Sequence, residues 1–346
     1  MVGRRVTMKR SERGSRGVAG VGERCCGRAD RWVGRARWVG GAGCLVVVLG
    51  WWLAGCGGGG EATWSDAELR LVSLSPAITQ VLNELGLGEA VVGVGEYDEV
   101  VRQGVPSVGR YVDLDLERLA RLRPTHVLAM TGAAGLPGPL EALAERQGFA
   151  VSDLSYPSDV ESALGLIRLV GQAVGRAERG GALAEEVGYR LRGIAALTRD
   201  RERRRALMVF GVPRVMASGP GTVNDDLLRM AGGENAAGGA RVSAPIFDGE
   251  ALVAASPEVV FLMLPGAEPL SGIDDERLAS FRGLGLPAMA WASGGSGELA
   301  GPGVVVLNDP GVLLPGPSMA TTAYSMAAAL HPELVGALAE VFRDTP

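Results

Sequence analysis

The sequence has few of the residue types that most redox, metal and phosphate sites require. All four cysteines lie at or before Cys56, so the rest of the chain can hold no disulfide, thiolate metal site or CxxC redox pair. Lys9 is the only lysine, which excludes a P-loop, a Schiff-base lysine and a kinase-type lysine from the main body of the chain. The only histidines, His126 and His331, are too few for a typical zinc or manganese receptor.

The common signatures of hydrolases are also missing. There is no Gly-x-Ser-x-Gly elbow and no His-Glu-x-x-His helix, and neither histidine has a plausible triad around it. Paired carboxylates are not excluded by these absences. The sequence therefore favours a protein that is not an enzyme, with an exported enzyme or a sensor module as the alternatives.

Basic and acidic side chains are distributed unevenly. Residues 1–56 hold eleven basic and three acidic side chains, whereas residues 57–346 hold 23 arginines and 36 acidic side chains, a balance of −13. Nucleic-acid binding depends on basic clusters that displace counterions from phosphates. We therefore expect no nucleic-acid partner.

Residues 1–56 are predicted to be an export signal that ends in a lipid-attachment site. The apolar run 43–54 is too short to span a bilayer, which needs about 20 helical residues. It ends in Leu-Ala-Gly-Cys, which resembles a bacterial lipobox with Cys56 as the lipidated residue. Residues 57–69 begin with four glycines and would form a flexible tether. The basic lead-in is unusually long, so translation starting further along would give a more ordinary signal.

From residue 70 the chain alternates between short apolar segments and amphipathic segments. Strands are expected at 71–74, 90–94, 126–130, 149–151 and 206–210, and helices at 76–85, 115–122 and 138–147. Alternation with such short crossovers predicts a mainly parallel sheet. Residues 159–203 carry apolar residues at helical spacing instead. They predict two helices, broken at Gly175 and Gly180-Gly181, of which the second is long and covers about 181–203.

One motif recurs 133 residues further along the chain. The segment 115–130 and the segment 248–263 share Asp, Glu, Leu, Pro, Val and Met at six of sixteen equivalent positions. A strand, a helix and a glycine-rich turn precede both copies. We therefore predict an α/β fold of two similar lobes, each a small mainly parallel sheet flanked by helices, joined by one long rigid backbone helix. The predicted parts are an N-terminal lobe at 70–158, a helical linker at 159–205 and a C-terminal lobe at 206–346.

Several ordered motifs resemble the helical-backbone, or class III, solute-binding proteins of ABC importers, which bind vitamin B12, ferric siderophores or haem. The resemblance covers residues 70–336 and is carried by 71–80, 91–94, 106–109, 115–117, 122–124, 227–235 and 330–334. One departure is Gln80, where the family often has glutamate. The resemblance implies an ABC permease and its ATPase as partners, a small-molecule ligand and a monomer. It implies no resident cofactor, because cobalamin, a ferric siderophore or haem would be cargo.

The resemblance also implies roles for particular residues. Glu117 and Glu250, one on each lobe, would dock onto arginines of the permease and set its orientation. The ligand would lie between the lobes, where tyrosine offers a rigid apolar face with one polar tip. The residues implied for this site are Tyr97, Arg110 and Tyr111 on the N-terminal lobe and Phe210 and Arg214 on the C-terminal lobe.

The cargo stays open at this point. Tyr97, Tyr111 or Tyr156 could ligate a haem iron, whereas cobalamin-binding relatives tend to have aromatic residues where this chain has Met130 and Ile246. An enzymatic use of the repeated glutamates is disfavoured, because they begin equivalent helices on separate lobes and a retaining glycosidase needs its carboxylates about 5 Å apart.

Overall fold

The computed structural model describes residues 68–110, 112–131, 135–271, 274–289 and 303–343. All the described residues belong to one compact unit, Gly59–Pro346. The predicted export signal, the lipidation site Cys56 and the candidate Tyr111 lie outside the described residues.

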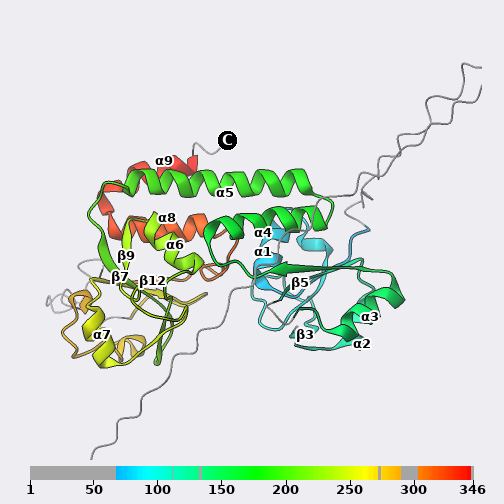
Figure 1. The fold of residues 1–346 in the computed structure, drawn as a ribbon, viewed down its shortest axis with the longest axis horizontal. Helices are drawn as coiled ribbons and strands as arrows, with labels where there is room; N and C mark the ends of the chain where they lie inside the picture. The colour runs from blue at the N-terminus through cyan, green and yellow to red at the C-terminus, as the bar shows by residue number, and fades with distance from the viewer. Residues whose placement is uncertain (1–67, 111, 132–134, 272–273, 290–302, 344–346) are drawn as a thin grey trace, which may run out of the picture. The chain divides into compact units, whose positions relative to one another are not determined.

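The N-terminal lobe is a four-stranded parallel sheet with helices on both faces (Figure 1). Its strand order is β2-β1-β5-β6. Apolar residues alternate along the strands, so Leu71 and Leu128 pack in one core with α1, and Val72 and Val127 pack in another with α2 and α3. The elements are β1 (Leu71–Ser73), α1 (Pro76–Glu84), η1 (Gly88–Ala90), β2 (Val91–Val94), β3 (Gly109–Arg110), β4 (Asp113–Leu114), α2 (Leu116–Leu122), β5 (His126–Thr131), α3 (Gly138–Gln147) and β6 (Ala150–Ser155).

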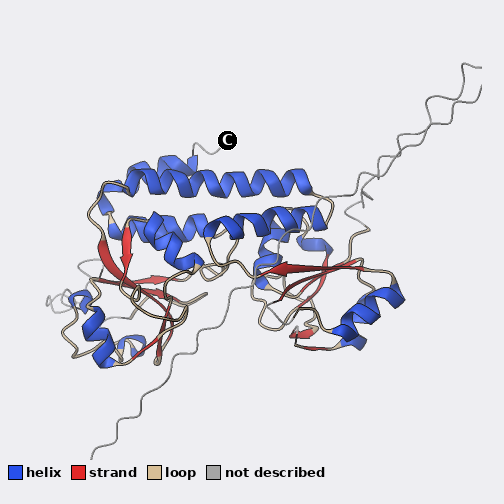
Figure 2. Cartoon of the chain, viewed as in Figure 1, coloured by secondary structure: helices blue, strands red, loops and turns tan. Residues whose placement is uncertain are grey.

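The C-terminal lobe has a second sheet, of order β10-β8-β7-β11-β12, with β9 also paired to β7. The pairings of β7 with β9 and β11, and of β11 with β12, are parallel, whereas β8 and β10 pair antiparallel. Figure 2 shows the strands gathered in these two groups. The elements are β7 (Arg204–Gly211), β8 (Val215–Ala217), α6 (Val223–Met230), β9 (Gly233–Asn235), β10 (Ile246–Phe247), α7 (Gly249–Ala255), β11 (Val259–Met263), η2 (Glu276–Leu278), β12 (Val304–Leu307), α8 (Met319–Leu330), η4 (Pro332–Leu334) and α9 (Val335–Arg343).

Two helices connect the lobes, α4 (Val160–Ala173) and α5 (Ala177–Thr198). The 22 residues of α5 give a length of about 33 Å, and α5 packs against α4, α6, α8 and α9 (Figure 1). One buried apolar cluster includes residues of α1, α4, α5, α6 and α8. The two lobes therefore share a continuous core along the backbone helix, and the predicted two-lobe α/β architecture is confirmed.

The predicted helix break at Gly180-Gly181 is wrong. Both glycines lie inside α5, and residues 174–176 form the non-helical segment that separates α4 from α5. A Cβ on Gly180 would lie 2.9 Å from Gly171 Cα of α4, and one on Gly171 would lie 2.8 Å from Gly180 Cα. These glycines are there because the two helix backbones approach closely, rather than to end a helix. The backbone helix also ends earlier than expected, at Thr198.

The neighbouring glycines of α5 give a matched pair of stability predictions. Gly180→Ala should lower the free energy of unfolding by about 1–3 kcal/mol, because the methyl group overpacks the helix crossing. A Cβ on Gly181 meets nothing within 4 Å, so Gly181→Ala should raise it by about 0.5–1 kcal/mol through better helix propensity. Denaturant unfolding of both variants checks this. Equal effects of the same sign would contradict the close crossing.

The sequence repeat corresponds to two matching helices. Both α2 and α7 have seven residues. Asp115 Oδ1 accepts a hydrogen bond of 2.8 Å from Arg118 N, and Asp248 Oδ1 accepts one of 2.8 Å from Ala251 N, so each carboxylate caps its helix. The capping residues that follow, Arg123 and Ser256, have φ of 45° and 44°. The two lobes therefore present Glu117 and Glu250 at the same helical position.

Candidate ligand-binding site

Both lobes contribute to a pocket of about 470 Å³. Tyr156, Pro157 and Ser158 come from the segment that leaves β6, the last strand of the N-terminal lobe. The C-terminal lobe supplies Phe210 of β7 and the segment 218–224, which leads into α6, and the pocket is completed by Ser243, Leu313 and Pro315. This volume lies within the usual range for small-molecule sites, about 300–1,000 Å³.

Hydrogen bonds within the C-terminal lobe fix the polar groups that line the pocket. Asn224 Nδ2 donates to Ser218 Oγ at 3.2 Å, and the buried Asn235 Nδ2 donates to Ser218 O at 3.1 Å and to Asp225 Oδ1 at 2.9 Å. Thr222 Oγ1 accepts from Asp225 N at 3.2 Å and caps α6. Groups fixed in this way do not lose side-chain freedom when a ligand arrives.

The remaining walls are apolar or aromatic. Phe210 is half-buried, and the Tyr156 side chain is available to a ligand because the residue is 65% exposed. Leu313 and Pro315 add aliphatic surface. Mostly apolar walls with a few convergent polar groups suit a large, partly flat molecule that makes a small number of directed contacts.

The sequence-predicted ligand residues are not gathered in this pocket. Phe210 lines it, whereas Arg214 is exposed in the turn between β7 and β8 and is not among its lining residues. Arg110 lines a separate hollow on the N-terminal lobe, where its Nε lies 3.6 Å from Glu96 Oε2. Tyr97 follows Glu96 and is 76% exposed. The roles of Tyr97, Arg110 and Arg214 stay predictions.

The loop that carries Tyr97 is anchored to α1. Tyr97 has a left-handed φ of 66°, and the next residue, Asp98, accepts a hydrogen bond of 2.5 Å from Thr79 Oγ1 and one of 3.2 Å from Val100 N. Burial raises the pKa of the Asp98 carboxyl above its ordinary value, and the bonds from Thr79 and Val100 offset part of that rise. The anchor holds an otherwise unfavourable backbone conformation at Tyr97.

The raised pKa of Asp98 predicts a pH dependence of stability. The folded chain holds the Asp98 proton more tightly than the unfolded chain, so its stabilising contribution is present below the ordinary pKa of 3.8 and is lost as pH rises through the folded-state pKa. The unfolding free energy of the unaltered chain, relative to that of Asp98→Asn, should therefore fall as pH rises from 3.8 through the folded-state pKa. Denaturant titrations across that range check the sign. A difference that stays constant or grows with pH would contradict it.

The two glutamates implied in docking are both exposed. Glu117 Oε1 lies 2.5 Å from Arg121 Nη2, with 80% of its side chain exposed. Glu250 makes no ion pair within the part of the chain that the structure describes. Because neither side chain is buried, both can reach a partner protein.

The histidines do not contribute to the pocket. His126 is 8% exposed at the start of β5, and His331 is 5% exposed at the end of α8. Burial lowers the pKa of His126. Across the described ranges, no group of three histidine, aspartate or glutamate side chains could hold a metal ion.

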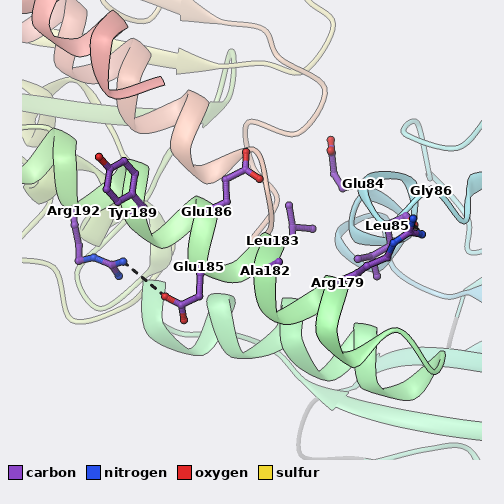
Figure 3. A pocket seen from close by; sticks show the side chains of 10 residues that line it. All are labelled: Glu84, Leu85, Gly86, Arg179, Ala182, Leu183, Glu185, Glu186, Tyr189 and Arg192. Atoms are coloured by element: carbon purple, nitrogen blue, oxygen red, sulfur yellow. Dashed lines mark hydrogen bonds and ion pairs between the residues drawn. The ribbon is translucent and has the colours of Figure 1, made fainter. Parts of the chain in front are cut away.

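A second, larger hollow of about 680 Å³ lies along α5, beside the end of α1 (Figure 3). Most of its charged groups already have partners: Glu185 Oε2 lies 3.9 Å from Arg192 Nη2, and Arg179 Nη1 donates to Leu85 O at 3.3 Å. Glu186 is paired with Arg190 at 2.7 Å. Mutually paired surface charges give this hollow little unsatisfied chemistry, so the pocket between the lobes is the better candidate site.

Sequence reasoning missed most of the residues that line the pocket. Tyr156 is predicted only as a candidate haem ligand, because the strand expected at 149–151 ends well before it, whereas β6 continues to Ser155 in the structure. No local pattern indicates Ser218, Asn224, Leu313 or Pro315, because folding alone brings these segments together. Among the residues that the structure describes, no helix is both long enough and apolar enough to cross a bilayer.

Comparisons with known proteins agree with this architecture. A vitamin B12-binding protein of Yersinia pestis is 25% identical over 199 residues, which cover 57% of this chain and 70% of that protein. The apo structure of the periplasmic heme-binding protein RhuT from Roseiflexus sp. RS-1 matches with a TM-score of 0.57 and 25% identity, over 76% of this chain and 98% of that one. A periplasmic heme-binding protein from Pseudomonas aeruginosa matches with a TM-score of 0.58 and 26% identity, over 76% and 92% of the two chains.

The match to a family model covers the N-terminal lobe, the backbone helix and the first part of the C-terminal lobe. Residues 71–284 match the model for periplasmic binding proteins, so the match begins at β1 and continues beyond η2. Members of this family bind substrates and are not enzymes, which agrees with the absence of catalytic motifs. The chain therefore belongs to the periplasmic binding protein family.

Proposed function

We propose that this chain is the extracytoplasmic receptor of an ABC importer and that it carries a cobalamin-like corrinoid, a ferric siderophore or haem. The observation that carries the proposal is the pocket built from both lobes, to which one lobe contributes Tyr156 and the other Phe210. The names of the relatives, which are vitamin B12-binding and heme-binding proteins, support the corrinoid and haem in this range. The receptor would hand its cargo to a permease driven by its ATPase and would work as a monomer.

Haem is the favoured alternative within this range because of Tyr156. The residue lines the pocket and is mostly exposed, and no histidine lies among the residues that line it. A tyrosine phenolate is a known axial ligand of haem iron. If haem is the cargo, Tyr156→Phe should change the absorption spectrum of the hemin complex. The same substitution should change the affinity for cobalamin little.

The mechanism follows from the shared core of the two lobes. Because α4 and α5 pack along both lobes and bury one continuous cluster, ligand binding should move the lobes only slightly, unlike closure about a flexible hinge. Glu117 and Glu250 would then meet arginines on the two halves of the permease and set the orientation of the complex.

Membrane attachment would be through a lipid on Cys56, with residues 57–69 as the tether. The apolar run that precedes Leu-Ala-Gly-Cys and the four glycines that follow it support this. Cys56→Ser should release the exported protein into the soluble fraction and abolish incorporation of a radiolabelled fatty acid. Retention of the label in Cys56→Ser would overturn the assignment.

The importer role is tested by uptake in cells of the source organism. Cells that lack this chain should lose high-affinity uptake of labelled cobalamin, hemin or a ferric siderophore, and the intact chain should restore it. Unchanged uptake of all three compounds would contradict the proposed function. Stimulation of the ATPase activity of the reconstituted transporter by the loaded receptor provides an independent check.

A further inference from the structure

Helix α1 of the N-terminal lobe contacts a loop of the C-terminal lobe through the side chain of Gln80. The loop comprises residues 308–318 and lies between β12 and α8. Ser318 Oγ lies 3.2 Å from Gln80 Oε1 and donates to Gly311 O at 2.7 Å. This contact joins positions 238 residues apart in the chain. It therefore connects the lobes independently of the two linker helices.

Two glycines make room for the Gln80 side chain. A Cβ on Gly316 would lie 2.8 Å from Gln80 Oε1, and a Cβ on Gly311 would collide with Gln80 Nε2. Neither glycine has a left-handed φ, so the reason for glycine here is space rather than backbone conformation. The loop thus forms a cradle that fits the glutamine closely.

An amide suits this cradle better than a carboxylate. The Ser318 hydroxyl has one hydrogen, and the shorter bond to Gly311 O uses it. An amide can place its NH₂ group toward Ser318 Oγ and complete the network, since the orientation of a side-chain amide is set by its partners. A carboxylate only accepts hydrogen bonds, so it would compete with Gly311 O for the same hydrogen.

The loop that Gln80 contacts also forms part of the pocket. Leu313 and Pro315 line the pocket and lie between the two glycines of the cradle. Backbone bonds make the loop compact: Leu314 N donates to Gly311 O at 2.8 Å and Met319 N to Gly316 O at 3.1 Å. A displacement of the loop would therefore move Leu313 and Pro315 together.

We propose that Gln80 is a positioning residue, which fixes the 308–318 loop against α1 and thereby sets the spacing of the pocket walls. Gln80 does not itself line the pocket; it acts through Leu313 and Pro315. The part of this inference that concerns ligand affinity rests on the proposed function, whereas the cradle and the spacing of the lobes do not.

A double-mutant cycle tests the cradle without any ligand. The test uses residues 57–346, which include the whole compact unit with the shared core. Gly316→Ala should lower Tm by about 2 °C or more, because the methyl group meets the amide. In the Gln80→Ala background, Gly316→Ala should leave Tm almost unchanged, since the amide that the methyl group would meet is absent. Equal losses of Tm in the two backgrounds would overturn the cradle.

Spin-label distances test whether the contact sets the spacing of the lobes. Residues 57–346 contain no cysteine, so Glu141→Cys on α3 and Ala254→Cys on α7 give one exposed label on each lobe. The distance distribution should be narrow in the unaltered chain and broader or shifted with Gln80→Ala and Gln80→Glu. The matched control is Asn83→Ala, which removes a hydrogen bond from α1 to Val100 O within the N-terminal lobe. Identical distributions in all four chains would overturn the proposal.

Ligand binding gives the last readout, with hemin and cyanocobalamin as the probes. Gln80→Ala should weaken binding of whichever probe the unaltered chain holds by about tenfold, because the pocket is no longer preorganised, while Asn83→Ala leaves it unchanged. An unchanged affinity in Gln80→Ala would overturn the link to the pocket. If neither probe binds the unaltered chain, corrinoid and haem cargo are excluded, and the double-mutant cycle and the label distances still decide the role of Gln80.

Discussion

Replacement of Glu117 and Glu250 together by alanine should reduce uptake to the background of cells that lack this chain, while ligand affinity stays intact. The two side chains are exposed and occupy equivalent positions on α2 and α7. Two charges, one on each lobe, fix the orientation of a docked partner more than they add affinity. Each single variant should retain part of the uptake, because one contact remains.

The matched control for this variant is the pair Glu141→Ala and Glu178→Ala. Both of these glutamates are exposed and lie in the first turns of α3 and α5, so the control removes the same number of negative charges from first-turn positions. Uptake should be unaffected in the control chain. Equal loss of uptake in the control, or loss of ligand affinity in the Glu117 and Glu250 double variant, would contradict a docking role.

Phe210→Ala should weaken ligand binding by about tenfold or more, which corresponds to at least about 1.4 kcal/mol of binding free energy. Phe210 lies on β7, is half-buried and lines the pocket together with Tyr156. Removal of its ring takes away apolar contact area that a large planar ligand would cover. Calorimetric titration with hemin and cyanocobalamin measures the loss.

Tyr189→Ala is the control for the aromatic substitution. Tyr189 is an exposed aromatic residue on α5 and lines the charged hollow of Figure 3 rather than the pocket between the lobes. Its loss should leave ligand affinity within about twofold of the unaltered chain, since surface changes away from a site have small effects. A larger effect from Tyr189→Ala than from Phe210→Ala would move the binding site to that hollow.

Much of the fold could be predicted because its determinants are local. Asp at the N-cap and Leu at the buried helix position recur in α2 and α7, so the repeat was visible in the sequence and corresponds to helices of identical length and capping. The predicted helix break at Gly180 is wrong because glycine occurs in helical segments for two reasons that look alike in sequence. It can end a helix, or it can let two helices approach closely, and only the position of Gly171 on α4 distinguishes them.

The pocket was harder to predict because its walls come from segments far apart in the chain. Phe210 was found through the resemblance of its strand to a known family. Leu313 and Pro315 lie in a loop with no periodicity, and they reach the pocket because the loop is held against α1 at Gln80. Contacts of that kind depend on how the lobes pack, which no local pattern encodes.

The most direct test of the central claim is an equilibrium titration of residues 57–346 with cyanocobalamin, hemin and a ferric siderophore, followed by calorimetry. The account predicts that one of the three binds with one-to-one stoichiometry and a Kd of about 1 μM or tighter, and that Phe210→Ala weakens the same interaction. If none of the three binds, or if binding does not depend on Phe210, the assignment of the pocket as a receptor site for such cargo is contradicted.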